Sequence, residues 1–421
     1  MAEVGATPTD QRLLERIGDR SIALTSAEAA VDVGLPLAVV EPRLLALAVA
    51  SGAQLRVSGA GEVSYVFPAH LRRLLHSRSW RLRARAGLRR LWAFVFRLVR
   101  CVFGVVLVLL VLVVSVLVLA LGLVMLARLD DDAGDVLGSV IGGSLELLVR
   151  LAVAVCSDQL WYGSPGSYPR AEGQTSPKRV AFLESVYSIL FGDGDPNSGL
   201  EQRRWKRIGA VLQRRGGVVI AEDLAPLLDL PAPPSDCQLG SDWADQAMLP
   251  VLLHFDGRPE VSEQGQLIYH FHALQGSTSA DTPFPAQPLR ERRIRFSRAS
   301  QDQRLGYAAL TGTLLLLSLV LLQWSLPVST ILVVIAELGL SYALLLLGVP
   351  LLRALVLRRS NAVIRARNRL RQRWAAWAQT HVGSLDVKRQ LAAQRRRAHS
   401  NVDAAPIYTT EQDLITQEID P

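Results

Sequence analysis

The sequence has few cysteines and lacks the short motifs that mark common enzyme sites. Its 421 residues include only three cysteines, Cys101, Cys156 and Cys237, which lie far apart. This pattern excludes a disulfide framework and a metal or iron–sulfur site built from clustered thiolates. A Walker loop, a G-x-S-x-G elbow, an H-E-x-x-H helix and a dinucleotide-binding glycine loop are also missing. We therefore expect a protein that is not an enzyme and holds no cofactor or metal.

Acidic residues are missing from long stretches, although the chain carries a net charge of +8. No Asp or Glu occurs from Arg72 to Leu129, and ten Arg in that stretch precede Cys101. Six more Arg lie within 290–304, and eight lie within 353–373. Each cluster adjoins an apolar run, as the cytoplasmic flanks of membrane helices do. A nucleic-acid-binding patch is the alternative, but the position of every cluster favours membrane flanks.

Three apolar runs are long enough to cross a bilayer, which takes about 20 residues of helix. They cover residues 98–129, 305–324 and 331–352. The last two form a hairpin with an uncharged turn, and arginines flank both of its outer ends. The positive-inside rule then puts the turn outside and the soluble parts on the cytoplasmic side.

A fourth span over 136–155 would return the chain to the cytoplasmic side after the first crossing. This segment carries Glu146 and Arg150, four residues apart on one helix face, where they could pair. An interfacial helix or a re-entrant segment is the alternative, so three or four spans are expected. Glu337 is the remaining intramembrane charge. It is either held inside the helix bundle by an arginine or a backbone group, or it relays protons.

A pattern of roughly sixty residues occurs twice, and such repeats set the architecture. Residues 44–48 followed by Ser51-Gly52 match residues 248–252 followed by Asp256-Gly257. Both copies predict the order helix, strand, helix, helix, hairpin, which is the order of a winged helix. The predicted fold class is an α+β membrane protein with two winged-helix-like domains and a transmembrane helical bundle of three to four spans.

The predicted organisation alternates soluble and apolar parts. The segments are 1–75, first winged-helix-like domain; 76–97, basic linker; 98–157, transmembrane helix and second span or re-entrant segment; 158–195, linker with an amphipathic helix; 196–275, second winged-helix-like domain; 276–303, basic linker; 304–353, transmembrane hairpin; 354–400, basic helical tail; and 401–421, a loose C-terminus.

Many winged helices read DNA with a polar or basic third helix, and this chain lacks that composition. The first third helix has only Arg43 as a cation, and the second carries Asp242 and Asp245, which repel phosphate. DNA is therefore an unlikely partner, and docking of a protein is expected. The candidate docking residues are apolar: Leu44, Leu47, Tyr65 and Phe67 in the first copy, and Leu249, Leu252, Tyr269 and Phe271 in the second.

Four aromatic residues are expected at the membrane surface. Trp161 and Tyr162 follow the second candidate span, and such residues are enriched at bilayer interfaces. Trp374 and Trp377 lie on one side of the basic tail, which we expect to form a long helix from 359 to 399 with a break at Gly383-Ser384. A helix of this kind can lie on an anionic membrane surface; packing between the two modules is the alternative.

Several stretches together resemble a known family. They are FLESVYSILFGDGDPN at 182–197, RRW at 203–205, GGVV at 216–219 and AEDLAP at 221–226. The chain resembles a poorly characterised membrane-protein family of cyanobacteria and plant plastids, whose plastid members sometimes carry an iron–sulfur cluster biosynthesis label. The resemblance implies a photosynthetic membrane, either thylakoid or plasma membrane. The three scattered cysteines do not support the iron–sulfur label, and the family offers no catalytic residues to carry over.

These observations predict an integral membrane scaffold or assembly factor that recruits protein partners through two winged-helix-like modules. A membrane-tethered DNA-binding regulator is one alternative. A small transporter or proton-linked channel that uses Glu146, Arg150 and Glu337 is the other. The expected partners are membrane lipid and proteins whose identity the sequence does not give, and a homo-oligomer stays open.

Overall fold

A computed structural model describes most of the chain, in two compact units. The described residues are 8–17, 23–57, 63–68, 80–126, 182–233, 242–263, 265–275, 287–325, 329–399 and 408–409, with isolated positions between 138 and 149. One unit, the modular unit, contains Met1–Gly87, Pro196–Arg293 and Val363–Pro421. The other, the helical unit, contains Leu88–Asp195 and Ile294–Ala362.

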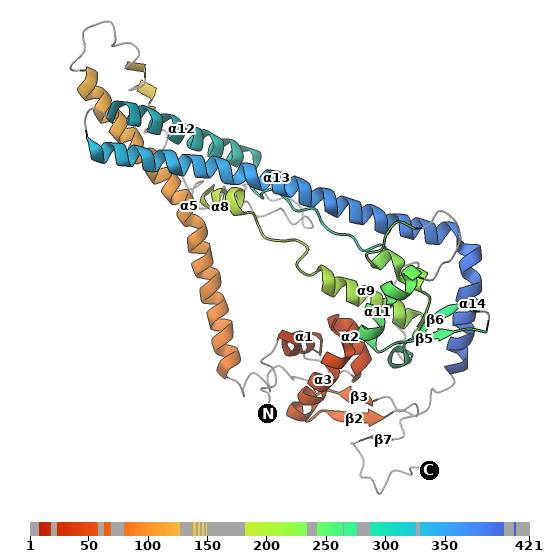
Figure 1. Ribbon diagram of the computed structural model, residues 1–421. Helices are drawn as coiled ribbons and strands as arrows, with labels where there is room; N and C mark the ends of the chain where they lie inside the picture. Colours follow the sequence, from red (N-terminus) through yellow and green to blue (C-terminus); the bar gives the residue numbers. More distant parts are fainter. Residues whose placement is uncertain are drawn as a thin grey trace, which may run out of the picture. The chain divides into compact units, whose positions relative to one another are not determined.

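The helical unit is built from three long apolar helices and one short helix (Figure 1). They are α5 (Trp80–Leu126) from Leu88 onward, α12 (Gln301–Ser325), α13 (Thr330–Thr380) up to Ala362, and the short α8 (Phe182–Phe191). By length and composition, α5, α12 and α13 each contain a segment that could cross a membrane. The three predicted apolar runs fall in these helices. The fourth predicted span, 136–155, lies mostly outside the described residues.

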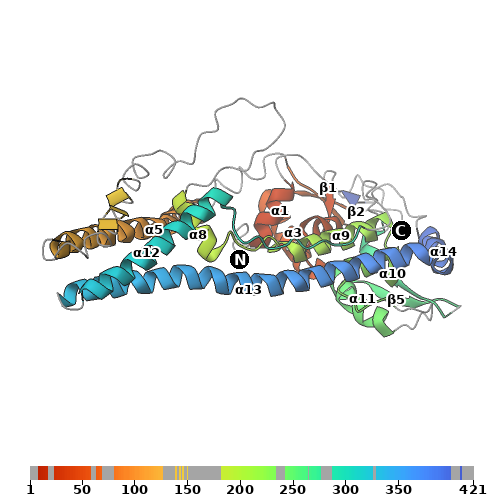
Figure 2. The same cartoon turned by 90° about the horizontal axis from the view of Figure 1, so that it is seen from above.

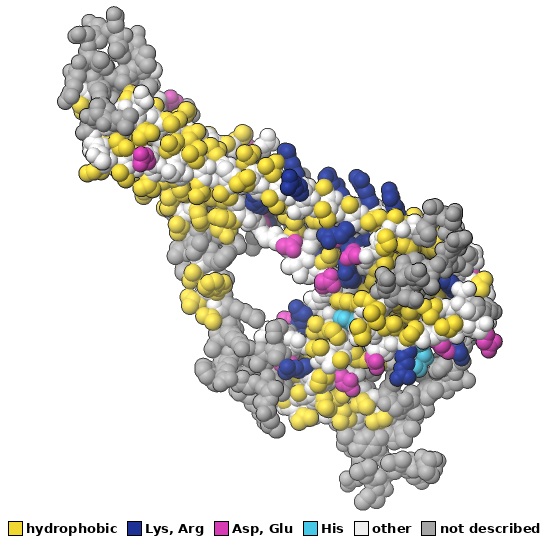
Figure 3. All heavy atoms as spheres, in the orientation of Figure 1, with side chains coloured by type: hydrophobic (Ala, Val, Ile, Leu, Met, Phe, Trp, Pro, Cys, Tyr) yellow, Lys and Arg dark blue, Asp and Glu magenta, His cyan; other side chains and the backbone are white. Residues whose placement is uncertain are grey.

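Polar bonds and one close glycine contact join the helices of this unit. The Tyr342 hydroxyl donates to the Phe103 carbonyl at 3.0 Å and so ties α13 to α5. Gly339 faces α12 closely, because a Cβ there would lie 2.5 Å from Oγ of Ser318. Small residues allow such close approach in membrane helix pairs. Figure 3 shows hydrophobic side chains over the visible surface of α12 and the first part of α13.

The apolar helices continue into their basic flanks. Helix α5 begins at Trp80, inside the predicted linker 76–97, and α13 continues without a break to Thr380 (Figure 2). The tail then bends at His381 and resumes as α14 (Val382–His399), so the predicted break at Gly383-Ser384 lies inside α14. Arg, Leu and Ala are strong helix formers, and a change from apolar to basic side chains does not end a helix.

The modular unit contains two modules with the same order of elements. The first module has α1 (Pro8–Ile17), β1 (Ala23–Thr25), α2 (Ser26–Val33), α3 (Leu37–Ser51), β2 (Gln54–Val57) and β3 (Val63–Val66). The second has α9 (Leu200–Arg214), β4 (Val218–Val219), α10 (Ala221–Leu224), η2 (Ala225–Leu227), α11 (Asp242–Phe255), β5 (Arg258–Val261) and β6 (Leu267–His270), followed by η3 (His272–Leu274).

The strand order is also the same in both modules. The first module has the order β1-β3-β2, with β7 (Tyr408–Thr409) added beside β2, and the second has the order β4-β6-β5. Tyr65 lies opposite Leu24, and Tyr269 lies opposite Val219. These pairs make Tyr65 equivalent to Tyr269, and Leu24 equivalent to Val219. The repeat read from the sequence is therefore also a repeat of structure.

The structure corrects the sequence alignment by one residue at the end of the third helix. Gly52 ends α3 with a φ of 65°, and Asp256 ends α11 with a φ of 51°. The next residue donates back into the helix in both modules, from Ala53 to the Ala48 carbonyl and from Gly257 to the Leu252 carbonyl. Gly52 is therefore equivalent to Asp256 rather than to Gly257.

Candidate docking surfaces, tail clamp and basic recess

Helix α3 of the first module exposes an apolar stripe to solvent. Leu45 is 47% exposed and Val49 is 76% exposed. Ala38 and Pro42 are exposed on the same side, at the spacing of one helix face. We call Leu45 and Val49 the first aliphatic pair.

Helix α11 exposes the same two positions in the second module. Leu249 is 56% exposed and Leu253 is 74% exposed, and they are equivalent to Leu45 and Val49. We call them the second aliphatic pair. A single exposed leucine is ordinary. Its recurrence at two equivalent positions in two different sequences suggests a function outside the core.

Most of the predicted docking residues are core residues instead. Of the eight, only Leu249 is exposed, and Leu252 is partly buried. The other six are buried in the cores of their modules: Leu44, Leu47, Tyr65, Phe67, Tyr269 and Phe271. The helix and strand periods explain the error, because the apolar positions that recur most regularly are those facing the module's own core.

Acidic residues lie beside both aliphatic pairs. Glu41 is exposed on α3, and Asp256 is exposed at the end of α11. Glu263, after β5 of the second module, adds further negative charge. These carboxylates would disfavour both a nucleic acid and an anionic lipid surface at the two pairs.

The two modules pack against each other through α2 and α9. Nε2 of Gln202 donates to the Val33 carbonyl at 2.8 Å. Gly209 is needed for this approach, because a Cβ there would lie 2.6 Å from Cγ2 of Val31. The aliphatic pairs therefore belong to modules that already share an interface, and the exposed sides of α3 and α11 remain outside the two cores.

A buried histidine lies at the edge of this module interface. His254 stacks on Trp205, with ring centroids 3.9 Å apart and an angle of 7° between the planes. Burial lowers the pKa of His254 to about 4, against the opposing effect of a hydrogen bond with the Leu35 backbone. The imidazole is therefore neutral at pH 7 and contributes to packing rather than to charge.

An ion-pair network, here called the tail clamp, fixes the second half of α13 to the second module. Arg371 is only 2% exposed. It pairs with Glu291 at 2.9 Å, and its Nε donates to Asp229 at 3.1 Å. Arg204 of α9 pairs with the other oxygen of Asp229, and Arg367 pairs with Glu291 at 2.7 Å. Burial alone would raise the pKa of Asp229, but its bonds to Arg371 and Arg204 outweigh burial and hold this pKa below its ordinary value.

Trp374 and Trp377 of the tail are packed against the second module. This corrects the prediction that they contact a membrane. Trp374 and Trp377 are buried among Val218, Ile220 and Ile268. The indole of Trp374 donates to the Pro231 carbonyl at 2.7 Å. Apolar stripes on basic helices look alike whether they face lipid or protein, so the sequence could not separate these two cases.

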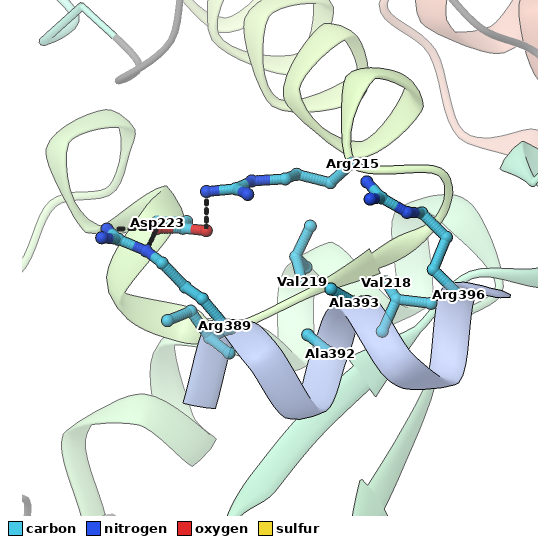
Figure 4. A pocket seen from close by; sticks show the side chains of 9 residues that line it. Arg215, Val218, Val219, Asp223, Arg389, Ala392, Ala393 and Arg396 are labelled. Atoms are coloured by element: carbon cyan, nitrogen blue, oxygen red, sulfur yellow. Dashed lines mark hydrogen bonds and ion pairs between the residues drawn. The ribbon is translucent and has the colours of Figure 1, made fainter. Parts of the chain in front are cut away.

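Three arginines surround a small basic recess where α14 faces the second module (Figure 4). Arg389 on α14 donates to Asp223 at 2.9 Å, and Arg215 pairs with the other oxygen of Asp223 at 3.1 Å. Arg396 lies further along α14, toward its C-terminal end, and points its guanidinium toward Arg215 (Figure 4). Sequence reasoning missed this site because its residues come from segments far apart in the chain.

The predicted intramembrane charges are only partly described. Glu337 is exposed on α13 among the described residues, and its place inside the helix bundle stays a prediction. Glu146 is exposed at one of the isolated described positions. Arg150, Trp161 and Tyr162 lie outside the described residues, so the Glu146–Arg150 pair and the interface aromatics stay predictions.

Arg353, just after the predicted hairpin, joins several segments of the helical unit. Its guanidinium donates to the carbonyls of Ser188 at 3.1 Å, Ile189 at 2.9 Å and Phe296 at 2.6 Å. Gly192 leaves room for it, because a Cβ there would lie 2.1 Å from Nη2. From the sequence alone, this arginine was expected only as part of a positive flank of a membrane helix.

Within the described residues, no group of three or more His, Cys, Asp or Glu could hold a metal ion.

Comparison with known proteins gives a relative of similar length but of unknown function. No family model matches the chain, and no solved structure matches it. The chain is similar to an uncharacterized chloroplastic protein of Arabidopsis thaliana, with 29% identity over 442 aligned positions that cover 99% of this chain and 82% of the relative.

Proposed function

We propose that the protein is a non-enzymatic membrane scaffold or assembly factor that recruits another protein through its two modules. The observation that carries this proposal is the recurrence of an exposed aliphatic pair at equivalent positions of α3 and α11. We further propose that both modules are winged-helix-like, because their elements and strands follow that order. In this proposal the third helix contacts protein instead of DNA.

The proposed occupant of these pairs is an amphipathic segment of a partner protein, with aliphatic residues on one side and basic residues at its flanks. Glu41 and Asp256 beside the pairs would attract such basic flanks. Burying one Leu or Val contributes about 1.5–3 kcal/mol, so one pair alone binds weakly. Two pairs on one chain strengthen binding by effective concentration if the partner reaches both.

We propose a photosynthetic membrane as the site of action, either a thylakoid or a plasma membrane. The relative is described as chloroplastic, and three helices of this chain are long and apolar enough to span a bilayer. We propose that the modules lie on the cytoplasmic side, or its equivalent in a plastid, because arginine clusters adjoin the ends of the apolar runs.

The test uses the full chain in native membranes. A photo-crosslinking amino acid at Val49 or Leu253 would capture a partner, and mass spectrometry would identify the attached peptide. The expected peptide belongs to another protein and carries an aliphatic face. The partner is then purified, and its affinity is measured for the chain with Leu45→Asp and Leu249→Asp together.

A matched control separates docking from general stickiness. Val387 is an exposed aliphatic residue on α14. Val387→Asp therefore makes the same kind of change, from aliphatic to acidic, at a site outside the two pairs. We expect the double variant to lose binding and Val387→Asp to retain it. An unchanged affinity in the double variant, or crosslinks only to a second copy of this chain, would contradict the proposed recruitment of another protein.

A further inference from the structure

Among the described residues, the lining of the basic recess carries more positive than negative charge, and Asp386 also approaches Arg389 at 3.8 Å. Arg215, Arg389 and Arg396 line it together with a single carboxylate, Asp223. The neighbouring acids are already engaged, because Glu222 pairs with Lys388 at 2.8 Å and Glu260 pairs with Arg395. Like charges held close together raise the energy of the site unless an anion joins them.

The arginines are held in place instead of moving freely in solvent. Asp223 is almost fully buried and accepts bonds from both Arg215 and Arg389. The stem of Arg396 lies over Gly216, where a Cβ would come within 2.5 Å of its Cδ. Gly216 has a φ of +60°, which favours glycine on its own. Burial lowers the pKa of Arg215, and the charges of Arg389 and Arg396 lower it further against the opposing effect of Asp223.

The recess is a feature of the second module and not of the repeated fold. The residue equivalent to Asp223 in the first module is Glu28, whose carboxylate accepts from the Thr25 backbone at 3.1 Å and caps α2. Two of the three arginines come from α14, which packs on β4 of the second module. The charge cluster therefore exists only because the tail returns to this module.

We propose that the basic recess binds a phosphate group, carried either by a soluble phosphate compound or by a lipid headgroup. Arginine presents its N–H groups as a planar fork that fits two oxygens of such an anion, and Asp223 orients two of these forks in advance. The recess holds about 10 Å³, close to the space of one water. One oxygen of the anion therefore enters, and the rest of the ligand stays at the surface.

The experiment measures binding of inorganic phosphate to the full chain in maltoside micelles, which contain no phosphate, by calorimetry at low ionic strength. The variants are Arg396→Ala and its neighbour Arg395→Ala. Both remove one positive charge from α14, but Arg395 lies outside the recess. We expect Arg396→Ala to weaken binding at least tenfold, because it removes a charge-assisted fork, and Arg395→Ala to change it less than twofold.

Two results would overturn the proposal. One is that the unmodified chain gives no phosphate-dependent heat, and the other is that both variants weaken binding equally. Melting curves of the variants without phosphate show whether either substitution unfolds the second module, and Arg396→Lys, which keeps the charge but not the fork, is expected to bind with intermediate affinity. Adding phosphatidylglycerol to the micelles separates the sources: displacement of phosphate assigns a lipid headgroup, and undisturbed binding assigns a soluble phosphate.

Discussion

The two modules share one plan of helices and strands, yet they depend on the rest of the chain to different degrees. In the first module, the charged pair Arg16–Asp32 lies at the surface, with side chains 48% and 33% exposed. In the second, Arg371 comes from a distant helix and is buried against Glu291 and Asp229. Two modules with the same order of elements can therefore differ in how much they depend on segments outside the module.

The same contrast appears at the ends of the third helices. The first module has Ala50, Gly52 and Ala53, all small residues that fit a plain helix end. The second module has His254, Asp256 and Gly257 at the equivalent positions. The differences at 256 and 257 give substitutions that make one module resemble the other, and His254 is a titratable group where the first module has Ala50.

The largest expected effect comes from Arg371→Ala. Removing one partner from a buried ion pair costs about 3–5 kcal/mol, because Glu291 is left buried with only Arg367 at its side. We expect hydrogen exchange in β4, β5 and β6 to speed up strongly, since the second module loses the tail that covers it. Hydrogen–deuterium exchange of the full chain, followed by mass spectrometry, resolves the two modules separately.

Arg16→Ala in the first module is the matched control for this effect. Exposed ion pairs contribute about 0–1 kcal/mol, so exchange in β1, β2 and β3 should hardly change. Equal effects of Arg16→Ala and Arg371→Ala would show that the tail clamp adds nothing beyond a surface pair. That result would remove the distinction between the two modules.

A smaller but clear effect is expected from Gly257→Ala, which copies Ala53 of the first module. A Cβ at Gly257 would lie 2.3 Å from Cε1 of Phe271 and 2.8 Å from Cδ2 of Leu252. Overpacking of this kind costs about 1–3 kcal/mol, and a lowered urea midpoint of the second module would show it. The reverse change, Ala53→Gly, should cost less than about 1 kcal/mol, and a similar loss from both changes would contradict the close packing of Phe271.

The third prediction concerns pH and His254, which replaces Ala50 of the first module. Its pKa is about 4 in the folded chain and about 6.5 when unfolded, so the unfolded state binds the proton first. The histidine's contribution is then complete above pH 6.5 and is lost as the pH falls toward 4. At pH 5.5 the loss is roughly 1–1.5 kcal/mol.

Replacement of His254 by Phe tests this pH dependence. The aromatic stack on Trp205 remains, while the titratable group is removed. We expect the second module to lose stability between pH 7 and 5.5 in the unmodified chain and to lose markedly less in His254→Phe, as measured by urea unfolding at both pH values. The same slope in both proteins would mean that other groups cause the acid sensitivity.

The sequence predicted the elements of the modules well because their signals are local. The alternation in residues 63–67, the cap formed by Thr25 and Glu28, and the glycine at 52 each act within a few residues. The three apolar helices followed from length and composition alone. These features need no knowledge of which distant segments meet.

The docking surfaces, the tail clamp and the basic recess could not be predicted in the same way. Leu44 and Leu45 are both apolar neighbours on one helix, and only the fold decides that Leu44 is buried and Leu45 exposed. Arg371 meets Glu291 and Asp229 only after α13 returns to the second module. Pairing across such sequence distances depends on tertiary packing, which local periodicity does not encode.

The smallest expected effect, and the only gain in stability, comes from Asp256→Gly, which copies Gly52. Asp256 has a φ of 51° and is the only non-glycine residue with positive φ in the described part of the chain. This conformation costs an L-residue about 1–2 kcal/mol, although Asp tolerates it better than most. Glycine adopts it without strain but loses more entropy on folding, so the net gain should be below about 1 kcal/mol. The reverse substitution, Gly52→Asp, should lower the urea midpoint of the first module by a similar amount. If Asp256→Gly instead destabilises the second module, the aspartate stabilises it through its charge or its hydrogen bonds, and the two helix ends differ in more than backbone strain.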